Sequence, residues 1–166
     1  MSTENLYNKE AKQKIKDIVE DVKIAMMATN LGSKPLSVVP MYTKKVDEDG
    51  TIWFLSALAS DHNVDIIQDT NIQLLYSGPS DKKFLSLYGH AEINTDQDKI
   101  DELYSKMDNA WFDGTEDANI SIIKFTPTEA AYWSNDSNKL VTLFKLAKAA
   151  VTGKDQKIGS SGKLKV

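Results

Sequence analysis

The chain of 166 residues contains no cysteine, which excludes disulfides, thiolate catalysis and cysteine metal sites. It has only two histidines, so no cluster of metal ligands is expected. All 20 basic residues are lysine and none is arginine. Arginine grips a phosphate or carboxylate through two parallel hydrogen bonds, whereas lysine acts as a compact point charge. Any anion site in this protein must therefore be built from lysine, histidine, hydroxyl and backbone N–H groups.

Three further absences concern location and partners. No run approaches the roughly 20 apolar residues of a membrane helix, so we expect a soluble protein without a membrane partner. The N-terminal sequence "MSTENLYNKEAKQ" lacks the apolar segment of a signal peptide, which predicts a cytoplasmic protein. The net charge is −4 and the lysines are scattered among acids, so there is no basic face for nucleic acid.

Hydrophobic residues make up 41% of the chain, enough at this length to bury one core in a single domain. Six apolar or alternating runs predict strands, and most are joined by tight turns. This pattern predicts an α+β fold, mainly β: an antiparallel six-stranded sheet that closes on itself, with helices packed outside. The expected strands cover residues 23–29, 35–46, 51–57, 71–78, 84–93 and 119–133.

Helical spacing of apolar residues predicts a first helix over residues 5–22 and a short helix over 64–69. Thr95 and Asp98 resemble a capping box at the start of a third helix over 95–107. The tail at 155–166 has no periodicity, and we expect it to be flexible. A C-terminal helix is predicted from an apolar stripe formed by Leu140, Leu143, Phe144, Ala147 and Val151.

The stretch "SALASDHNV" joins a predicted strand to a predicted helix through small and polar residues. One interpretation is a helix cap, in which Ser60 or Asp61 accepts from the unpaired N–H groups of the first turn. The other uses the same N–H groups and the helix dipole to hold an anion, with Ser60, His62 and Asn63 as added donors. Both interpretations stay open from the residues alone.

The stretch "VVPMYTKK" also allows two interpretations. It fits an edge strand whose end is solvated at Lys44 and Lys45, since Pro40 lacks a ladder donor. Alternatively, the missing N–H leaves neighbouring backbone groups free to contact a planar ring. Four large aromatic residues also allow two interpretations: they could pack in the core or at an interface, or stack on a flat cofactor. They are Trp111, Phe112, Tyr132 and Trp133.

Several motifs, in this order along the chain, together resemble the pyridoxamine 5′-phosphate oxidase-like superfamily of FMN-binding split barrels. They are "IAMMAT", "VPM", "IWFLS…S.HN..I", "IQLLYSGPS…FLSLYGHAEI", "AWFDGTED", "FTPTEAAYW" and "KLVTLFKLAKAAVTG". The last two are similar to the bacterial general stress protein branch. The resemblance implies an FMN-binding split-barrel domain over residues 1–154. It also implies a homodimer with the cofactor in two grooves at the subunit interface.

The resemblance implies ring contacts for one strand in particular. Val39, Pro40 and Met41 match an Arg-Pro-Met sequence that runs under the flavin, with Val39 in place of the arginine. Lys44 matches a position that approaches the flavin or substrate. Trp111 is the candidate for stacking.

A second set of positions concerns the cofactor's strand end and phosphate. Leu55 and Ser56 match a pair that contacts the cofactor at the end of a strand. Ser60, His62 and Asn63 fall where the family holds the FMN phosphate, with an apparent one-residue insertion in the loop.

The resemblance implies a general stress protein that binds FMN, as a flavin-dependent oxidoreductase or flavin reductase of unknown substrate. The alternative is a non-catalytic protein that binds or sequesters flavin. Two other possibilities are a different planar ligand, such as a deazaflavin or haem, and a membrane-surface role for the basic C-terminal helix. Oxidation of pyridoxamine phosphate is not expected, because "IGSSGKLKV" lacks the family's C-terminal Arg and His pair.

Overall fold

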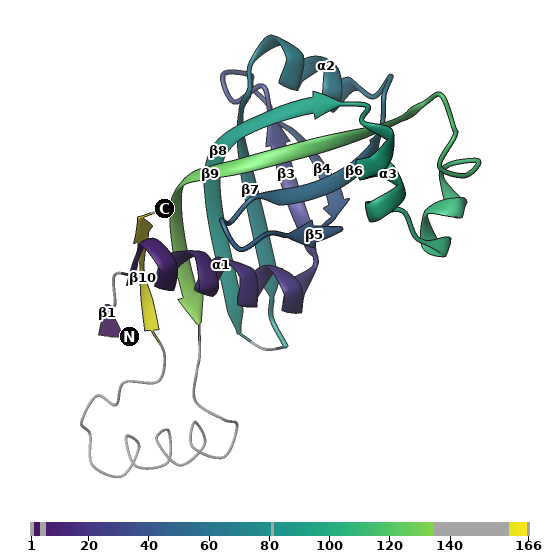
Figure 1. Cartoon of the computed structure of the whole chain (residues 1–166). Coiled ribbons are helices and arrows are strands. Elements are labelled where there is room, and N and C mark those ends of the chain that lie inside the picture. The colour runs from purple at the N-terminus through teal and green to yellow at the C-terminus, as the bar shows by residue number, and fades with distance from the viewer. Residues whose placement is uncertain (1, 4–5, 81, 135–159, 166) are drawn as a thin grey trace.

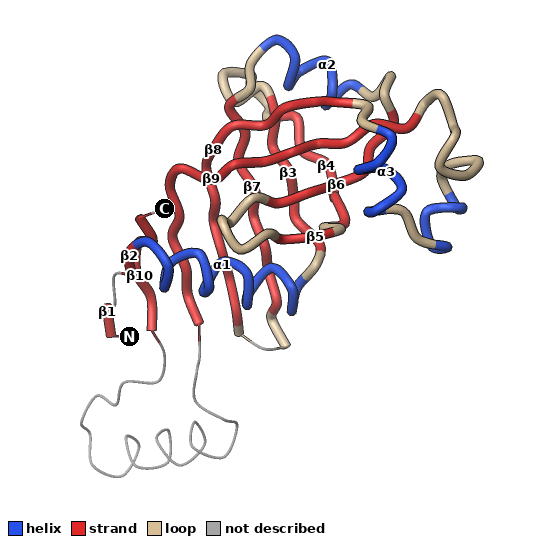
Figure 2. Tube along the Cα trace, in the orientation of Figure 1, coloured by secondary structure: helices blue, strands red, loops and turns tan. Residues whose placement is uncertain are grey.

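The structure is a computed structural model that describes residues 2–3, 6–80, 82–134 and 160–165 (Figure 1). Within these residues all strands belong to one curled sheet, and helices lie against it (Figure 2). The long strands are β3 (Ile24–Thr29), β4 (Ser37–Tyr42), β6 (Ile52–Ala57), β7 (Asn71–Gly78), β8 (Lys83–Asn94) and β9 (Ile120–Ser134). The other elements are β1 (Ser2–Thr3), β2 (Leu6–Tyr7), α1 (Asn8–Val22), β5 (Lys45–Val46), α2 (Asp61–Gln68), α3 (Gln97–Leu103), η1 (Lys106–Ala110) and β10 (Ser160–Lys165).

The six long strands are the six that the sequence predicts, and five of them pair antiparallel in the order β9-β8-β7-β3-β4. Strand β6 pairs with the first half of β9, with Ser56 opposite Ser121. A register shift between Tyr88 and Gly89 leaves Thr128 as an extra residue on β9 and bends that strand along β8. A Cβ on Gly89 would lie 2.2 Å from the carbonyl oxygen of Thr126, so only glycine allows this approach. The expected α+β, mainly β split barrel is confirmed.

The core fills the inside of the curl, and α1 crosses its open side (Figure 1). Ala11, Ile15, Ile18 and Val19 recur at helical spacing and are buried, which places one face of α1 against the sheet. They meet inward-facing strand residues such as Phe54, Leu74, Leu87 and Phe125, all fully buried. A smaller cluster beneath α3 contains Ile100, Leu103, Ile120 and Ile122.

The outer face of the sheet carries large apolar side chains that remain exposed. Met26 of β3 lies opposite Pro40 of β4 on one side and Leu75 of β7 on the other. Met26 is 42% exposed and Leu75 is 45% exposed. Exposed apolar patches of this kind mark interaction surfaces. The patch, called the outer apolar face below, comprises Ile24, Met26, Val38, Tyr42, Leu75, Phe84 and Trp133.

Some predicted boundaries are corrected by the structure. The first helix begins at Asn8, because residues 6–7 pair with β10, and the second begins at Asp61 rather than 64. The cap of α3 is Asp96, whose side chain accepts from the backbone N–H of Lys99 at 2.8 Å, so the capping pair lies one residue beyond Thr95 and Asp98. An ionised carboxylate is a stronger acceptor than a hydroxyl at a helix start.

The described part of the C-terminal tail forms a strand. Residues 160–165 form β10, which pairs antiparallel with β9 and parallel with β1 and β2. Backbone hydrogen bonds to the edge of β9 suffice for this, so no alternating pattern was needed in the sequence. The predicted helix at Leu140 to Val151 and residues 155–159 lie outside the described residues. In the described chain, none of the helices has the length and apolar content needed to cross a membrane.

Candidate functional site

The turn between β6 and α2 separates the two interpretations of "SALASDHNV". Ser60 stands at the N-cap position in an extended conformation, with φ −71° and ψ 148°, yet its side chain makes no capping hydrogen bond to α2. Its hydroxyl Oγ lies 3.1 Å from Nε2 of His62 instead. The Ser60 hydroxyl and the His62 imidazole are therefore paired side by side at the start of the helix, where backbone N–H groups and the helix dipole favour an anion.

Asn63 has a different role from the one expected. It is fully buried, and its Nδ2 donates to the carbonyl oxygen of Ala57 at 3.1 Å and to Oγ of Ser121 at 2.9 Å. Its Oδ1 accepts from the hydroxyl of Ser56 at 2.9 Å. The Ser56 hydroxyl is buried in the same network. These two side chains hold the turn together from inside and present no polar group to a ligand.

The electrostatics of the turn rest on one imidazole. Burial lowers the pKa of His62, although the nearby Asp61 and Asp65 carboxylates act in the opposite direction. Asp65 itself accepts from the Thr29 hydroxyl at 2.7 Å, which ties α2 to the end of β3. His62 is thus neutral at pH 7, and the sequence contains no lysine between Lys45 and Lys82.

Strand β4 divides the predicted ring contacts between two faces. Met41 is 9% exposed and belongs to the core, and Val39 packs against the same core. Pro40 is exposed on the opposite face, on a strand that ends the sheet order, as the edge-strand interpretation requires. Of the three residues, Pro40 alone faces outward, so the structure does not place Met41 at a ligand surface. A charge introduced at Met41 would enter the core.

Two other predicted contacts lie away from the turn. Leu55 of β6 is partly buried against the cluster beneath α3. Trp111 follows η1, and its side chain is 71% exposed. Its backbone N–H donates to the carbonyl oxygen of Asp108 at 2.9 Å. Neither side chain has a described contact with Ser60 or His62.

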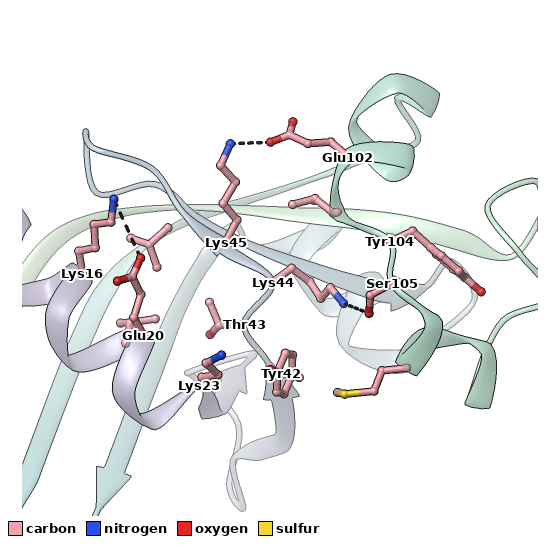
Figure 3. A pocket seen from close by; sticks show the side chains of 14 residues that line it. Lys16, Glu20, Lys23, Tyr42, Thr43, Lys44, Lys45, Glu102, Tyr104 and Ser105 are labelled. Carbon is pink, nitrogen blue, oxygen red and sulfur yellow. Dashed lines mark hydrogen bonds and ion pairs between the residues drawn. The ribbon is translucent and has the colours of Figure 1, made fainter. Parts of the chain in front are cut away.

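A groove of about 750 Å³ opens where α1, the link between β4 and β5, and the α3–η1 segment meet (Figure 3). Lys44 lines it, but its Nζ lies 2.6 Å from Oδ2 of Asp108 and 3.1 Å from Oγ of Ser105. The Lys44 and Asp108 side chains are only 7% and 10% exposed. Burial acts to raise the pKa of Asp108, yet hydrogen bonds from Lys44 and Ser105 outweigh it and leave that pKa below its usual value.

The other groove lysines show how the remaining positive charge is used. Lys45 pairs with Glu102 at 2.5 Å and with Asp47 at 3.1 Å. Hydrogen bonds from Lys45 and then Lys99 lower the pKa of Glu102 to about 2. Lys23 follows α1 in the left-handed region, with φ 62°, and its side chain is exposed at the groove rim. Most of the groove's cations are thus held by carboxylates of the same chain.

Strand β4 connects the two places. Its first residue, Ser37, pairs with Thr29, which is bonded to α2, while its last residue, Tyr42, lines the groove. The sequence pointed to Ser60, His62, Pro40 and Lys44 as candidates, but it did not point to the partners Ser121, Ser105 and Asp108. Those partners lie about 60 residues away along the chain from the groups they bind, so no local signal could reveal them.

Known proteins are similar to this chain in sequence. A sequence model described as "Pyridoxamine 5′-phosphate oxidase like" matches residues 10–157. General stress protein 26 of Bacillus subtilis (strain 168) is 24% identical over 128 residues, covering 75% of this chain and 89% of that protein. The relatives found are of the kind that the sequence resemblance indicated.

Solved structures share the fold. A putative general stress protein 26 from Jannaschia sp. CCS1 matches with a TM-score of 0.80 and 24% identity, covering 95% of this chain and 99% of that one. The general stress FMN/FAD binding protein of Xanthomonas citri matches with a TM-score of 0.67 and 22% identity, covering 78% of this chain and 92% of that one.

Because the family model spans most of the length of this chain, the chain belongs to the pyridoxamine 5′-phosphate oxidase-like family.

Proposed function

We propose that this protein is a general stress protein that binds FMN and uses it in a redox reaction. The observation that carries the proposal is the Ser60 hydroxyl and His62 imidazole, paired 3.1 Å apart at the start of α2. Backbone N–H groups at a helix start favour a phosphate, and these two side chains add donors beside them. A structural neighbour named as an FMN/FAD binding stress protein supports a flavin as the ligand.

The residues that would hold the cofactor follow from this placement. Ser60, His62 and the first-turn N–H groups would bind the phosphate, and the exposed face of β4 at Pro40 would lie against the ring. When bound, the flavin would supply the electron-carrying chemistry. The chain's own part would be to bind and orient it. The second candidate is a flavin-binding protein without catalysis. It is favoured by the ion pair between Lys44 and Asp108, because a lysine bound to a carboxylate of its own chain is not available to contact the flavin or a substrate.

We also propose a homodimer in which the outer apolar face packs against a second copy and the flavin lies at the interface. Seven large apolar side chains on one sheet face suit a self-complementary contact in the obligate range, on the order of 2,000 Å². Charged residues are depleted there, as they are at the centres of dimer interfaces. A face of this size would otherwise promote aggregation.

One set of measurements tests the flavin. FMN titrated into the purified protein should show saturable changes in the flavin absorption bands, and anaerobic NAD(P)H should bleach the bound flavin if the protein is an oxidoreductase. Binding without bleaching by reductants would support the second candidate. An absence of FMN binding, or haem bands in the purified protein, would contradict both.

A second experiment tests the dimer. The double change Met26→Glu and Leu75→Glu places charges at the centre of the outer apolar face, and light scattering should then report a monomer at micromolar concentration. Ile67→Glu is the matched control, because Ile67 is 70% exposed on α2 and lies outside that face. A wild-type monomer, or a dimer unaffected by the double change, would contradict the assignment.

A further inference from the structure

Ser121 is a polar residue inside an apolar stretch of β9. Its neighbours Ile120, Ile122 and Ile123 are buried isoleucines, and Ser121 itself is fully buried. A buried hydroxyl is costly unless it is hydrogen-bonded. Filling the core therefore does not explain why residue 121 is a serine.

The reason lies across the sheet, where Ser121 faces Ser56 at the end of β6. The Ser121 hydroxyl donates to the carbonyl oxygen of Ser56 at 3.0 Å and lies 2.9 Å from the Ser56 hydroxyl. It also accepts from Nδ2 of Asn63 at 2.9 Å. One hydroxyl on β9 thus bonds to both ends of the turn that leads into α2.

Asn63 passes this restraint to the start of the helix. It is the third residue of α2, and its backbone N–H donates to the carbonyl oxygen of Ser60 at 3.1 Å. Fixing the Asn63 side chain from below therefore fixes the first turn, and with it the direction of the Ser60 hydroxyl and the His62 ring. Asn119 adds to the same attachment, because its carbonyl oxygen accepts from the N–H of Leu58 at 2.7 Å.

We infer that Ser121 is a positioning residue for phosphate recognition: it preorganises the β6–α2 turn from the neighbouring strand β9 without touching the ligand. This inference rests on the proposed function, in which that turn holds the FMN phosphate. A turn held in its binding conformation loses less freedom when the phosphate binds. Loosening it should therefore weaken FMN more than riboflavin, which lacks the phosphate.

The test compares FMN and riboflavin affinities in the full-length wild type and in Ser121→Ala. We expect FMN affinity to fall roughly three- to tenfold, the cost of ordering one flexible side chain or loop position on binding, with riboflavin affinity little changed. Tyr76→Phe is the matched control. It removes another buried hydroxyl contact, the 2.8 Å pair with Thr43, far from the turn, and should leave the ratio of the two affinities at its wild-type value.

Ser121→Cys guards against failure to fold, since it keeps the volume but replaces the hydroxyl with a weak hydrogen-bonding group. It should lower the ratio as Ser121→Ala does. A wild-type preference for FMN that both variants retain would overturn this inference alone. A wild type that binds both flavins equally would overturn the phosphate site itself, and this inference with it.

Discussion

At the end of β4 near α2 the structure places hydroxyls and an imidazole, whereas at the other end it places four lysines around a groove. The β6–α2 segment has no basic residue other than His62, since no lysine lies between Lys45 and Lys82. The groove end has abundant charge, but Lys44 and Lys45 are both held by carboxylates. The density of lysine in the sequence is therefore a poor guide to where an anion would bind.

The comparison teaches that availability matters more than charge. A lysine already paired with an acid must give up that pair to bind a ligand, and for a buried pair the loss is large. A hydroxyl, an imidazole and helix N–H groups carry less charge, but they lie together at the start of α2. In the function proposed above, they are the donors of the phosphate site in a chain without arginine.

The largest expected effect is a loss of stability when the buried ion pair at the groove end is broken. Asp108→Ala leaves the Lys44 ammonium buried without its carboxylate and should lower the free energy of unfolding by about 3 kcal/mol. Denaturant unfolding at pH 7 measures it. Replacing both partners, Lys44→Met with Asp108→Leu, should recover most of the loss, because no unpaired charge remains. A loss below about 1 kcal/mol for Asp108→Ala would show that the pair is solvated.

The next effect concerns the α2 end. Ser60→Ala with His62→Ala removes both side-chain donors and should weaken FMN at least tenfold, since hydrogen bonds to a charged acceptor are each worth about 1.5 to 3 kcal/mol. Riboflavin should lose little. Titration of both ligands, with thermal melts alongside, measures this. Equal weakening of FMN and riboflavin would show that the turn has a purely structural role. It would also contradict the proposal that the α2 end, rather than the groove end, binds the phosphate.

A smaller effect at the α2 end is a dependence of protein stability on pH through His62. The folded pKa of His62 lies below its ordinary value of 6.5, so below about pH 6.5 the unfolded chain binds a proton that the folded chain does not. Stability should therefore fall as the pH drops from about 6.5 through the folded pKa. His62→Gln should flatten that part of the profile of unfolding free energy against pH. An unchanged slope would mean that the imidazole is not buried enough to matter.

The smallest effect is a matched test within the groove. Glu102→Gln breaks the exposed pair with Lys45, next in sequence to Lys44, and should leave the denaturation midpoint unchanged at physiological salt, because exposed ion pairs contribute little. NMR titration of wild-type Glu102 should show a pKa below its ordinary value, because Lys45 and Lys99 donate to the ionised carboxylate. A clear stability loss in Glu102→Gln would erase the distinction between the buried and exposed lysines.

The sequence by itself determined the six long strands, because alternation and turn residues act over a few neighbours. It also placed Ser60 and His62 together, since they are two residues apart at a helix start. It predicted Pro40 on an edge strand correctly, because proline lacks the N–H that an inner strand needs.

Only the tertiary structure decided which groups remain available for a ligand. Alternation along β4 is visible in the sequence, yet a shift of one residue exchanges the two faces, so the inward position of Met41 came from pairing with β3. Asn63 is buried and bonded within the chain because β9 places Ser121 beside it. Lys44 forms an ion pair within the chain because η1 places Asp108 beside it. A side chain's chemistry is local, but its partners come from strands and helices distant in the chain, and burial beside those partners determines its role.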